Sequence, residues 1–173
     1  GDVIWSEDFD NLDSSKYWFD GSADRAFSIV SGAGKLTRTF KANDPMAIYL
    51  KENNKKPFDK SGALHVYTNF MIEEPASENY QFSPIVLFND VTDTDSYRSL
   101  VTVYAYNGKL YAINTDSNVP SWNQRIASSE ELEAVDYGKW YTLDLLLNVS
   151  GDGTDKYYYT LTNTDTNKKY TMK

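Results

Sequence analysis

The chain has 173 residues, no cysteine and a formal net charge of −8 at pH 7. This length predicts one domain over residues 1–173 with a core of its own. The lack of cysteine excludes disulfides, zinc knuckles and thiol catalysis. The basic residues are scattered in an acidic chain, which argues against nucleic-acid binding, and no apolar run is long enough to span a membrane.

Short runs of alternating apolar and polar residues, separated by polar turns, follow one another along the chain. Such runs predict β-strands. Aromatic residues make up 15% of the chain, which suits twisted sheets. We expect strands near residues 3–5, 17–19, 27–30, 35–40, 46–51, 63–72, 81–89, 140–149, 157–162 and 168–172.

The strongest local signal is Asn107-Gly108, which lies between two runs rich in β-branched and aromatic residues. This dipeptide favours the positive φ angles of a two-residue type I′ turn and predicts a β-hairpin. The register then pairs Tyr106 with Lys109, Ala105 with Leu110, Tyr104 with Tyr111, Val103 with Ala112 and Thr102 with Ile113.

This hairpin has two different faces, because side chains alternate along a strand. One face is apolar and suits a core, with Val101, Val103, Ala105, Leu110 and Ala112. The other face carries Arg98, Thr102, Tyr104, Tyr106, Lys109 and Tyr111. Residues 63–72 and 140–149 alternate in the same way. Leu64, Val66, Thr68, Phe70 and Ile72, and likewise Tyr141, Leu143, Leu145, Leu147 and Val149, share the predicted core faces.

The one helical signal is SSEELEAV at residues 128–135, where a serine could cap a short helix, and an extended connection is the alternative. About a dozen short strands with regular turns and no internal repeat remain. The predicted fold is all-β, a two-sheet antiparallel β-sandwich or jelly roll.

Catalytic motifs are scarce. No nucleophile elbow, phosphate loop or zinc-protease motif is present, and His65 is the only histidine. No strand carries the alternating acids of sandwich-fold glucanases, although glycoside hydrolysis needs two facing carboxyl groups. The remaining enzyme hypothesis is a polysaccharide lyase built from His65, Tyr67, Asn69, Arg98 and Tyr104.

Metal binding is left open by three groups of acidic residues in turns. Calcium binds oxygen ligands in flexible loops. None of the groups has the EF-hand spacing, and aspartates in turns commonly bond to the local backbone instead. We therefore predict no metal site with named ligands, and leave open a structural calcium ion at Asp8, Asp10 and Asp13, at Asp90, Asp93 and Asp95, or at Asp152 and Asp155.

Exposed aromatic rings are the features that best indicate a function. Rigid, amphipathic Trp and Tyr stack on the apolar faces of sugars, while Arg, Asp and Asn bind the hydroxyl groups. Trp122 follows Pro120 in a polar loop and either stacks on a ligand or anchors the loop. We predict a carbohydrate-binding site of Trp122, Tyr104, Tyr111, Tyr106, Arg98 and Arg125; simple cross-strand pairing of the tyrosines is the alternative. Trp5, Trp18 and Trp140 start strands and are assigned to the core.

The order of these elements resembles the concanavalin-A-like, or laminin-G-like, jelly-roll superfamily. The resemblance is carried by Phe9 to Trp18, Gly34-Lys35-Leu36, Ser61-Gly62-Ala63-Leu64, the Asn-Gly hairpin and Gly138-Lys139-Trp140-Tyr141. It implies two curved antiparallel sheets, often a calcium ion and frequently glycan binding, as in carbohydrate-binding modules of bacterial extracellular glycan-degrading proteins. It transfers no binding residue to this chain.

Together these observations predict a noncatalytic carbohydrate-binding module that recognises a polysaccharide or oligosaccharide, with a preference for a neutral glucan. We expect a monomeric module of a larger bacterial protein, outside the cell or at its surface, whose signal peptide has been removed. The alternatives are a laminin-G-like adhesion or protein-interaction domain and a jelly-roll polysaccharide lyase.

Overall fold

The computed structural model describes residues 3, 6–11, 13, 15–20, 25–38, 47–50, 62–77, 79–85, 87–88, 99–113, 129–149 and 156–172. Within these ranges all regular elements are strands, so no helix there could cross a membrane. The chain divides into two compact units, Gly1–Pro57 and Phe58–Lys173, and each is described by itself. The expectation of a single domain over residues 1–173 stays a prediction.

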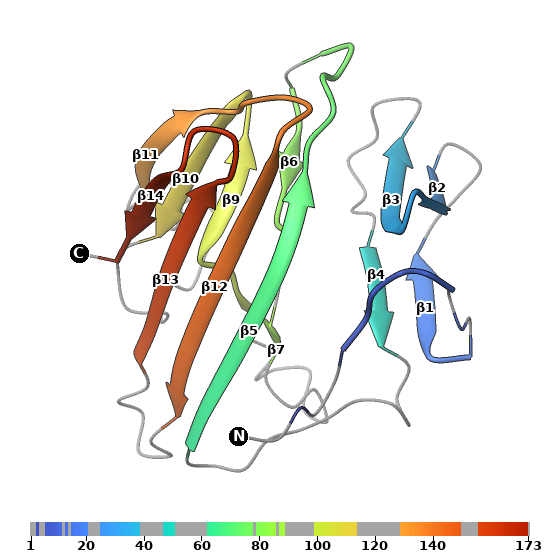
Figure 1. The fold of residues 1–173 in the computed structure, drawn as a ribbon, viewed down its shortest axis with the longest axis horizontal. Helices are drawn as coiled ribbons and strands as arrows, with labels where there is room; N and C mark the ends of the chain where they lie inside the picture. The colour runs from blue at the N-terminus through green and yellow to red at the C-terminus, as the bar shows by residue number, and fades with distance from the viewer. Residues whose placement is uncertain are drawn as a thin grey trace. The chain divides into compact units, whose positions relative to one another are not determined.

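The N-terminal unit contains two small antiparallel sheets (Figure 1). One pairs β1 (Tyr17–Asp20) with β4 (Ala47–Leu50), and the other pairs β2 (Arg25–Val30) with β3 (Ala33–Arg38). Four of the five predicted strands of this unit are thereby confirmed. Val3 lies outside any strand and is 80% exposed, whereas Ile4 and Trp5 fall outside the described residues. The side chain of Trp18 is likewise not described.

The C-terminal unit is built on two four-stranded antiparallel sheets (Figure 1). We call β14-β13-β12-β5 the front sheet and β11-β10-β9-β6 the back sheet. The front sheet comprises Lys168–Thr171, Lys156–Asn163, Trp140–Val149 and Gly62–Met71 in that order. The back sheet comprises Ser129–Ala134, Lys109–Ile113, Val103–Tyr106 and Gln81–Phe82.

The core of this unit lies between the two sheets, as the alternating patterns predict. Phe70, Tyr141, Leu143 and Leu161 from the front sheet pack in one cluster with Val103, Ala105, Leu110 and Ala112 from the back sheet. The rings of Phe70 and Tyr141 stack with their centroids 5.3 Å apart. Two antiparallel sheets that bury their facing side chains make the unit an all-β, sandwich-like structure.

The Asn107-Gly108 hairpin is confirmed. Both turn residues have positive φ, 49° and 84°, as a type I′ turn requires. Four of the predicted pairs occur in the ladder, from Lys109 with Tyr106 to Ala112 with Val103. The N–H of Ile113 donates to the Thr102 carbonyl at 2.9 Å, which extends the same register beyond the strand.

Three details of the predicted strands differ in the structure. The SSEELEAV segment is strand β11, which pairs with β10, so the extended alternative is right and the helix is wrong. The edge of β10 offers backbone partners to this segment, and Leu132 packs against the core. Residues 81–89 contain two short strands, β6 and β7 (Leu87–Phe88), and β7 pairs with β8 (Ser99–Leu100). Val101 lies outside β9 and packs with Tyr104 and Ile113 rather than in the main core.

Candidate functional site

The predicted sugar-binding residues fall into two groups. Trp122, Arg98 and Arg125 lie outside the described residues. Tyr104, Tyr106 and Tyr111 lie on the back sheet, on the opposite face from the main core. Only the three tyrosines of the predicted carbohydrate-binding site are therefore described.

Tyr104 is buried, with 1% of its surface exposed. Its ring stacks on Tyr111 with a centroid distance of 5.5 Å and an interplanar angle of 17°. Its hydroxyl donates to Ser129 Oγ at 2.7 Å. Burial, more than any neighbouring charge, raises the pKa of the Tyr104 hydroxyl. The ring faces of Tyr104 are closed to a ligand in this structure, and only Tyr106 and Tyr111 remain partly exposed.

A different exposed aromatic surface lies on the outward face of the front sheet. Four large side chains on this face are exposed: Tyr67 (57%), Tyr158 (46%), Trp140 (42%) and Leu146 (37%). We call these four residues the aromatic face. The assignment of Trp140 to the core is wrong for a simple reason. Odd-numbered residues of β12 point inward, so residue 140 points outward.

The strand register arranges this face in two neighbouring rows. Tyr67, Asp144 and Thr160 lie side by side across β5, β12 and β13. His65, Leu146 and Tyr158 form the next row, two residues further along each strand. Strand spacing and rise place Tyr67 and Tyr158 about 12 Å apart on a diagonal, with Trp140 about 14 Å from Tyr67. The exposed rings thus surround a central carboxylate.

That carboxylate has a defined partner. Nε2 of His65 lies 2.5 Å from Oδ1 of Asp144, and both side chains are about half exposed (60% and 47%). A carboxylate only accepts hydrogen bonds, so Nε2 is the donor. Oδ2 of Asp144 makes no hydrogen bond within the described part of the chain. The pair therefore presents open hydrogen-bonding atoms between the exposed rings.

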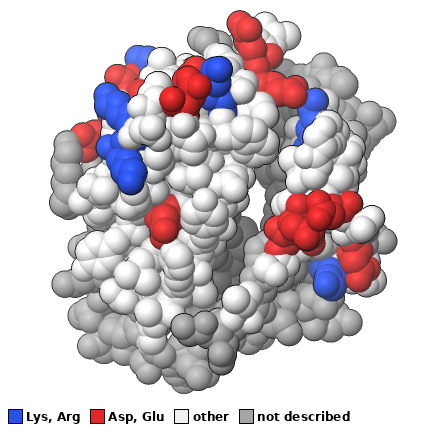
Figure 2. Space-filling view, viewed as in Figure 1, with Lys and Arg blue, Asp and Glu red and all other residues white. Residues whose placement is uncertain are grey.

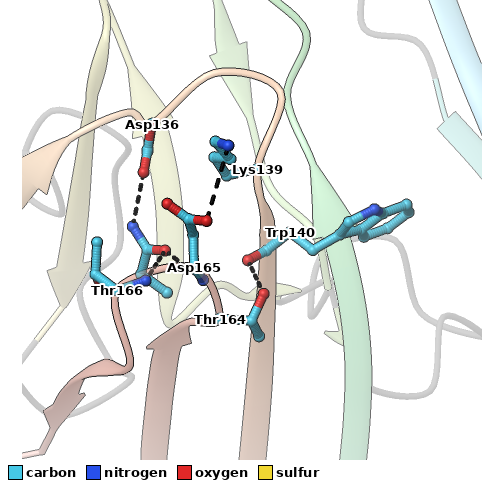
Figure 3. Close-up of polar contacts among 7 residues, drawn as sticks. Asp136, Lys139, Trp140, Thr164, Asp165 and Thr166 are labelled. Atoms are coloured by element: carbon cyan, nitrogen blue, oxygen red, sulfur yellow. Dashed lines mark hydrogen bonds and ion pairs between the residues drawn. The ribbon is translucent and has the colours of Figure 1, made fainter.

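Trp140 is held firmly at its backbone. Its carbonyl accepts hydrogen bonds from Thr164 Oγ1 at 2.6 Å and from the Thr164 N–H at 3.1 Å. Figure 3 shows the indole extending away from the Asp136 and Asp165 side chains on the same edge. A fixed backbone leaves only the side-chain torsions of Trp140 to be ordered when a ligand binds.

The adjoining turn is also tied down. The Asn163 side chain accepts from the N–H groups of Asp165 and Thr166, at 3.1 and 3.3 Å, and donates to Asp136 at 3.2 Å (Figure 3). Nζ of Lys139 lies 3.7 Å from Asp165. This end of the front sheet is therefore a rigid support for Trp140.

The sheets are joined near this turn by the partly buried carboxylate of Glu133. It accepts hydrogen bonds from Tyr141, Asn163 and Tyr170 at 2.7, 3.1 and 2.8 Å. Burial and the hydrogen bond to Glu133 raise the pKa of Tyr141 strongly. With its oxygens engaged by three strands of the front sheet, Glu133 has a structural role.

Metal ligation gains no support from the acidic turns. Asp8 and Asp13 accept hydrogen bonds from nearby backbone N–H groups, at 3.0 Å in each case. The second and third acidic groups fall outside the described residues. In the described ranges no cluster of three or more His, Cys, Asp or Glu side chains could hold a metal ion. A structural calcium ion stays an open prediction.

A small pocket of about 240 Å³ opens at the β14 edge of the front sheet, next to β11 of the back sheet. It is lined by Glu130, Leu132, Tyr159, Lys169, Tyr170 and Thr171. Sites for drug-sized ligands typically enclose about 300–1,000 Å³. The aromatic face is an open surface rather than such a pocket, which suits an extended ligand better than a small enclosed one.

Only part of the predicted lyase set comes together. His65, Tyr67 and Asn69 share the outward face of β5, with Asp144 beside them on β12. Tyr104 is buried on the back sheet, and Arg98 is outside the described residues.

The aromatic face has a signal in the sequence. The alternation of β5 and β12 places Tyr67 and Leu146 on the face opposite the core, and this pattern could have identified the aromatic face.

Comparisons with protein-family models, curated proteins and solved structures find no match to this chain.

Proposed function

We propose that this protein is a noncatalytic carbohydrate-binding module, with a concanavalin-A-like jelly-roll fold, from a larger extracellular bacterial protein that handles polysaccharides. One observation carries the proposal: Tyr67, Trp140, Leu146 and Tyr158 are exposed together on one face of a rigid sheet. The two antiparallel sheets with a shared core support the jelly-roll assignment.

The chemistry of this surface suits a sugar chain. An exposed Tyr or Trp ring offers an apolar face to the C–H groups of a sugar and a polar edge to water or hydroxyl groups. Polar side chains lie between the rings, namely His65, Asn69, Thr142, Asp144 and Thr160. Figure 2 shows that the described surface in view is largely uncharged over the middle of the larger unit.

The size of the surface fits more than one sugar ring. Tyr67 and Tyr158 are about 12 Å apart by strand geometry. Each stacked ring contributes about 0.5–1.5 kcal/mol beyond its buried area. We therefore expect affinity in the micromolar to millimolar range for a single module.

Calorimetry and affinity electrophoresis on a panel of soluble polysaccharides test this proposal. The double variant Tyr67→Ala/Tyr158→Ala should weaken binding about tenfold or more, because it removes two stacking surfaces worth about 1 kcal/mol each. Both residues are exposed, so thermal unfolding should not change.

Tyr106→Ala and Trp122→Ala provide the matched controls on the site that the sequence predicted. If binding falls in these variants and not in the double variant, the ligand uses the back-sheet tyrosines and the Trp122 loop. Absence of binding to every glycan would reject the module and favour an adhesion domain that uses the same exposed apolar surface.

A second candidate is supported by the His65–Asp144 pair, with Tyr67 and Asn69 on the same face. A histidine oriented by a carboxylate beside a tyrosine could remove and donate protons in a polysaccharide lyase. Incubation with uronic-acid polymers would then generate unsaturated products with new ultraviolet absorbance, and His65→Ala would abolish it. No increase in absorbance across such polymers would reject this activity.

A further inference from the structure

We propose that Asp144, held by His65, sets the ligand class of the aromatic face: it selects neutral sugars and rejects uronic or sulfated sugars. This inference rests on the proposed carbohydrate-binding function and assigns its specificity to one carboxylate.

The position of Asp144 makes it the centre of the site. Its register neighbours are Tyr67 on β5 and Thr160 on β13. Leu146, which lies two residues further along β12, faces the same way and is flanked by His65 and Tyr158. A sugar chain that spans Tyr67 and Tyr158 therefore crosses β12 between Asp144 and Leu146.

The pair leaves one carboxylate oxygen open to the hydroxyl groups of a sugar. Oδ1 of Asp144 is 2.5 Å from His65 Nε2, and Oδ2 has no other hydrogen-bond partner in the described ranges. A carboxylate accepts hydrogen bonds from sugar hydroxyls, and such charge-assisted bonds are stronger than neutral ones. The open oxygen of Asp144 can therefore accept a charge-assisted hydrogen bond from a sugar hydroxyl, while His65 holds the carboxylate in place.

The charges of the face disfavour an anionic ligand. Asp144 is the one acidic residue among the described outward-facing side chains of the front sheet. The one Lys or Arg among them is Lys169, on β14, two strands away from β12. Figure 2 shows the same distribution, with the basic groups of the larger unit near its margin. A carboxylate or sulfate placed over Asp144 would meet a like charge, with no Lys or Arg beside it among the described side chains of this face, in a chain of net charge −8.

Calorimetry with the full chain tests this inference on neutral glucans, xylans and mannans and on polygalacturonate and alginate. The native protein should prefer a neutral polymer. Asp144→Asn should weaken that binding about tenfold or more, because hydrogen bonds to charged groups are worth more than neutral ones. The same variant should also show a smaller difference in affinity between neutral and anionic polymers than the native protein shows.

Glu131→Gln is the matched control, since it changes the net charge equally at a carboxylate on the back sheet that is exposed to nearly the same degree (49%) and is paired with Lys109. Equal effects of the two substitutions would overturn a specific role of Asp144, as would a native preference for polyuronates. His65→Gln should weaken neutral binding in the same direction as Asp144→Asn.

The outcomes separate this inference from the proposed function. If Tyr67→Ala/Tyr158→Ala loses binding and Asp144→Asn does not, the aromatic face binds carbohydrate as proposed, but Asp144 does not select the ligand. If the native protein binds no glycan, the proposed function fails and this inference fails with it. Unchanged thermal unfolding of Asp144→Asn verifies that the fold is intact.

Discussion

Tyr141 connects the two sheets of the larger unit through its hydroxyl group. The hydroxyl donates to Glu133 at 2.7 Å and accepts from the Asp136 N–H at 3.0 Å. The ring itself is fully buried. Burial and the Glu133 carboxylate both oppose the phenolate, so the pKa of Tyr141 lies above its ordinary value.

We expect Tyr141→Phe to lower the free energy of unfolding by about 1–2 kcal/mol at neutral pH, because the Asp136 N–H and Glu133 lose a buried partner. A raised folded-state pKa gives stability that is complete below the unfolded value near pH 10 and is lost as pH rises through the folded value. Urea unfolding should therefore show a smaller difference in the free energy of unfolding between the native protein and the variant above pH 10 than at pH 7. If that difference in the free energy of unfolding grew with pH, the raised pKa of Tyr141 would not be the cause.

Trp140 and Tyr104 show how single residues can be misassigned from local context. Trp140 follows Gly138-Lys139 at the start of an apolar strand, yet its even position turns it to solvent. Tyr104 belongs to a face with charged neighbours in sequence, yet it packs with Val101 and Ile113. Alternation fixes which side a residue faces, whereas burial depends on what covers that side.

At the scale of elements, the hairpin of β9 and β10 is fixed by its turn and secured by its neighbours. The Asn107 N–H donates to the Tyr80 carbonyl at 3.1 Å, and the Val135 N–H donates to the Gly108 carbonyl at 2.9 Å. The turn therefore links the hairpin to the segments before β6 and after β11.

Gly108→Ala should lower the free energy of unfolding by about 1 kcal/mol, because a side chain is strained at a φ of 84°. Asn107→Gly should leave the urea midpoint nearly unchanged, since glycine readily adopts the positive φ of that position. An unchanged midpoint in Gly108→Ala would show that the turn relaxes to another type.

Strand β11 illustrates a limit of local propensity. Its glutamates favour a helical start, yet the segment forms the edge of the back sheet. Lys109 and Glu131 form a cross-strand ion pair at 2.7 Å, and Glu133 reaches the front sheet. These partners are distant in sequence, so no local window contains the information that selects the strand.

At the scale of the whole molecule, the main core belongs entirely to the C-terminal unit. Both apolar clusters are made of residues between Phe70 and Met172. The N-terminal unit has its own aromatic contact, between Phe9 and Phe27, with centroids 6.3 Å apart.

We expect the fragment Phe58–Lys173 to fold by itself with a single cooperative thermal transition, because it retains both clusters. It should also keep the glycan affinity of the full chain, since Tyr67, Trp140, Leu146 and Tyr158 lie within it. Near-ultraviolet circular dichroism and calorimetry are the measurements. An unfolded fragment would instead support the single domain over residues 1–173.

The sequence by itself determined the all-β class, the hairpin register and the inward faces of β5 and β12. These follow from short-range chemistry: the positive φ of Asn107-Gly108 and the two-residue period of a strand. Only the tertiary structure decided that Tyr104 is buried, that residues 129–134 form a strand and that Asp144 lies among exposed rings. Each of these depends on which distant segments pack or pair with the residue, and that is set by the assembly of the sheets.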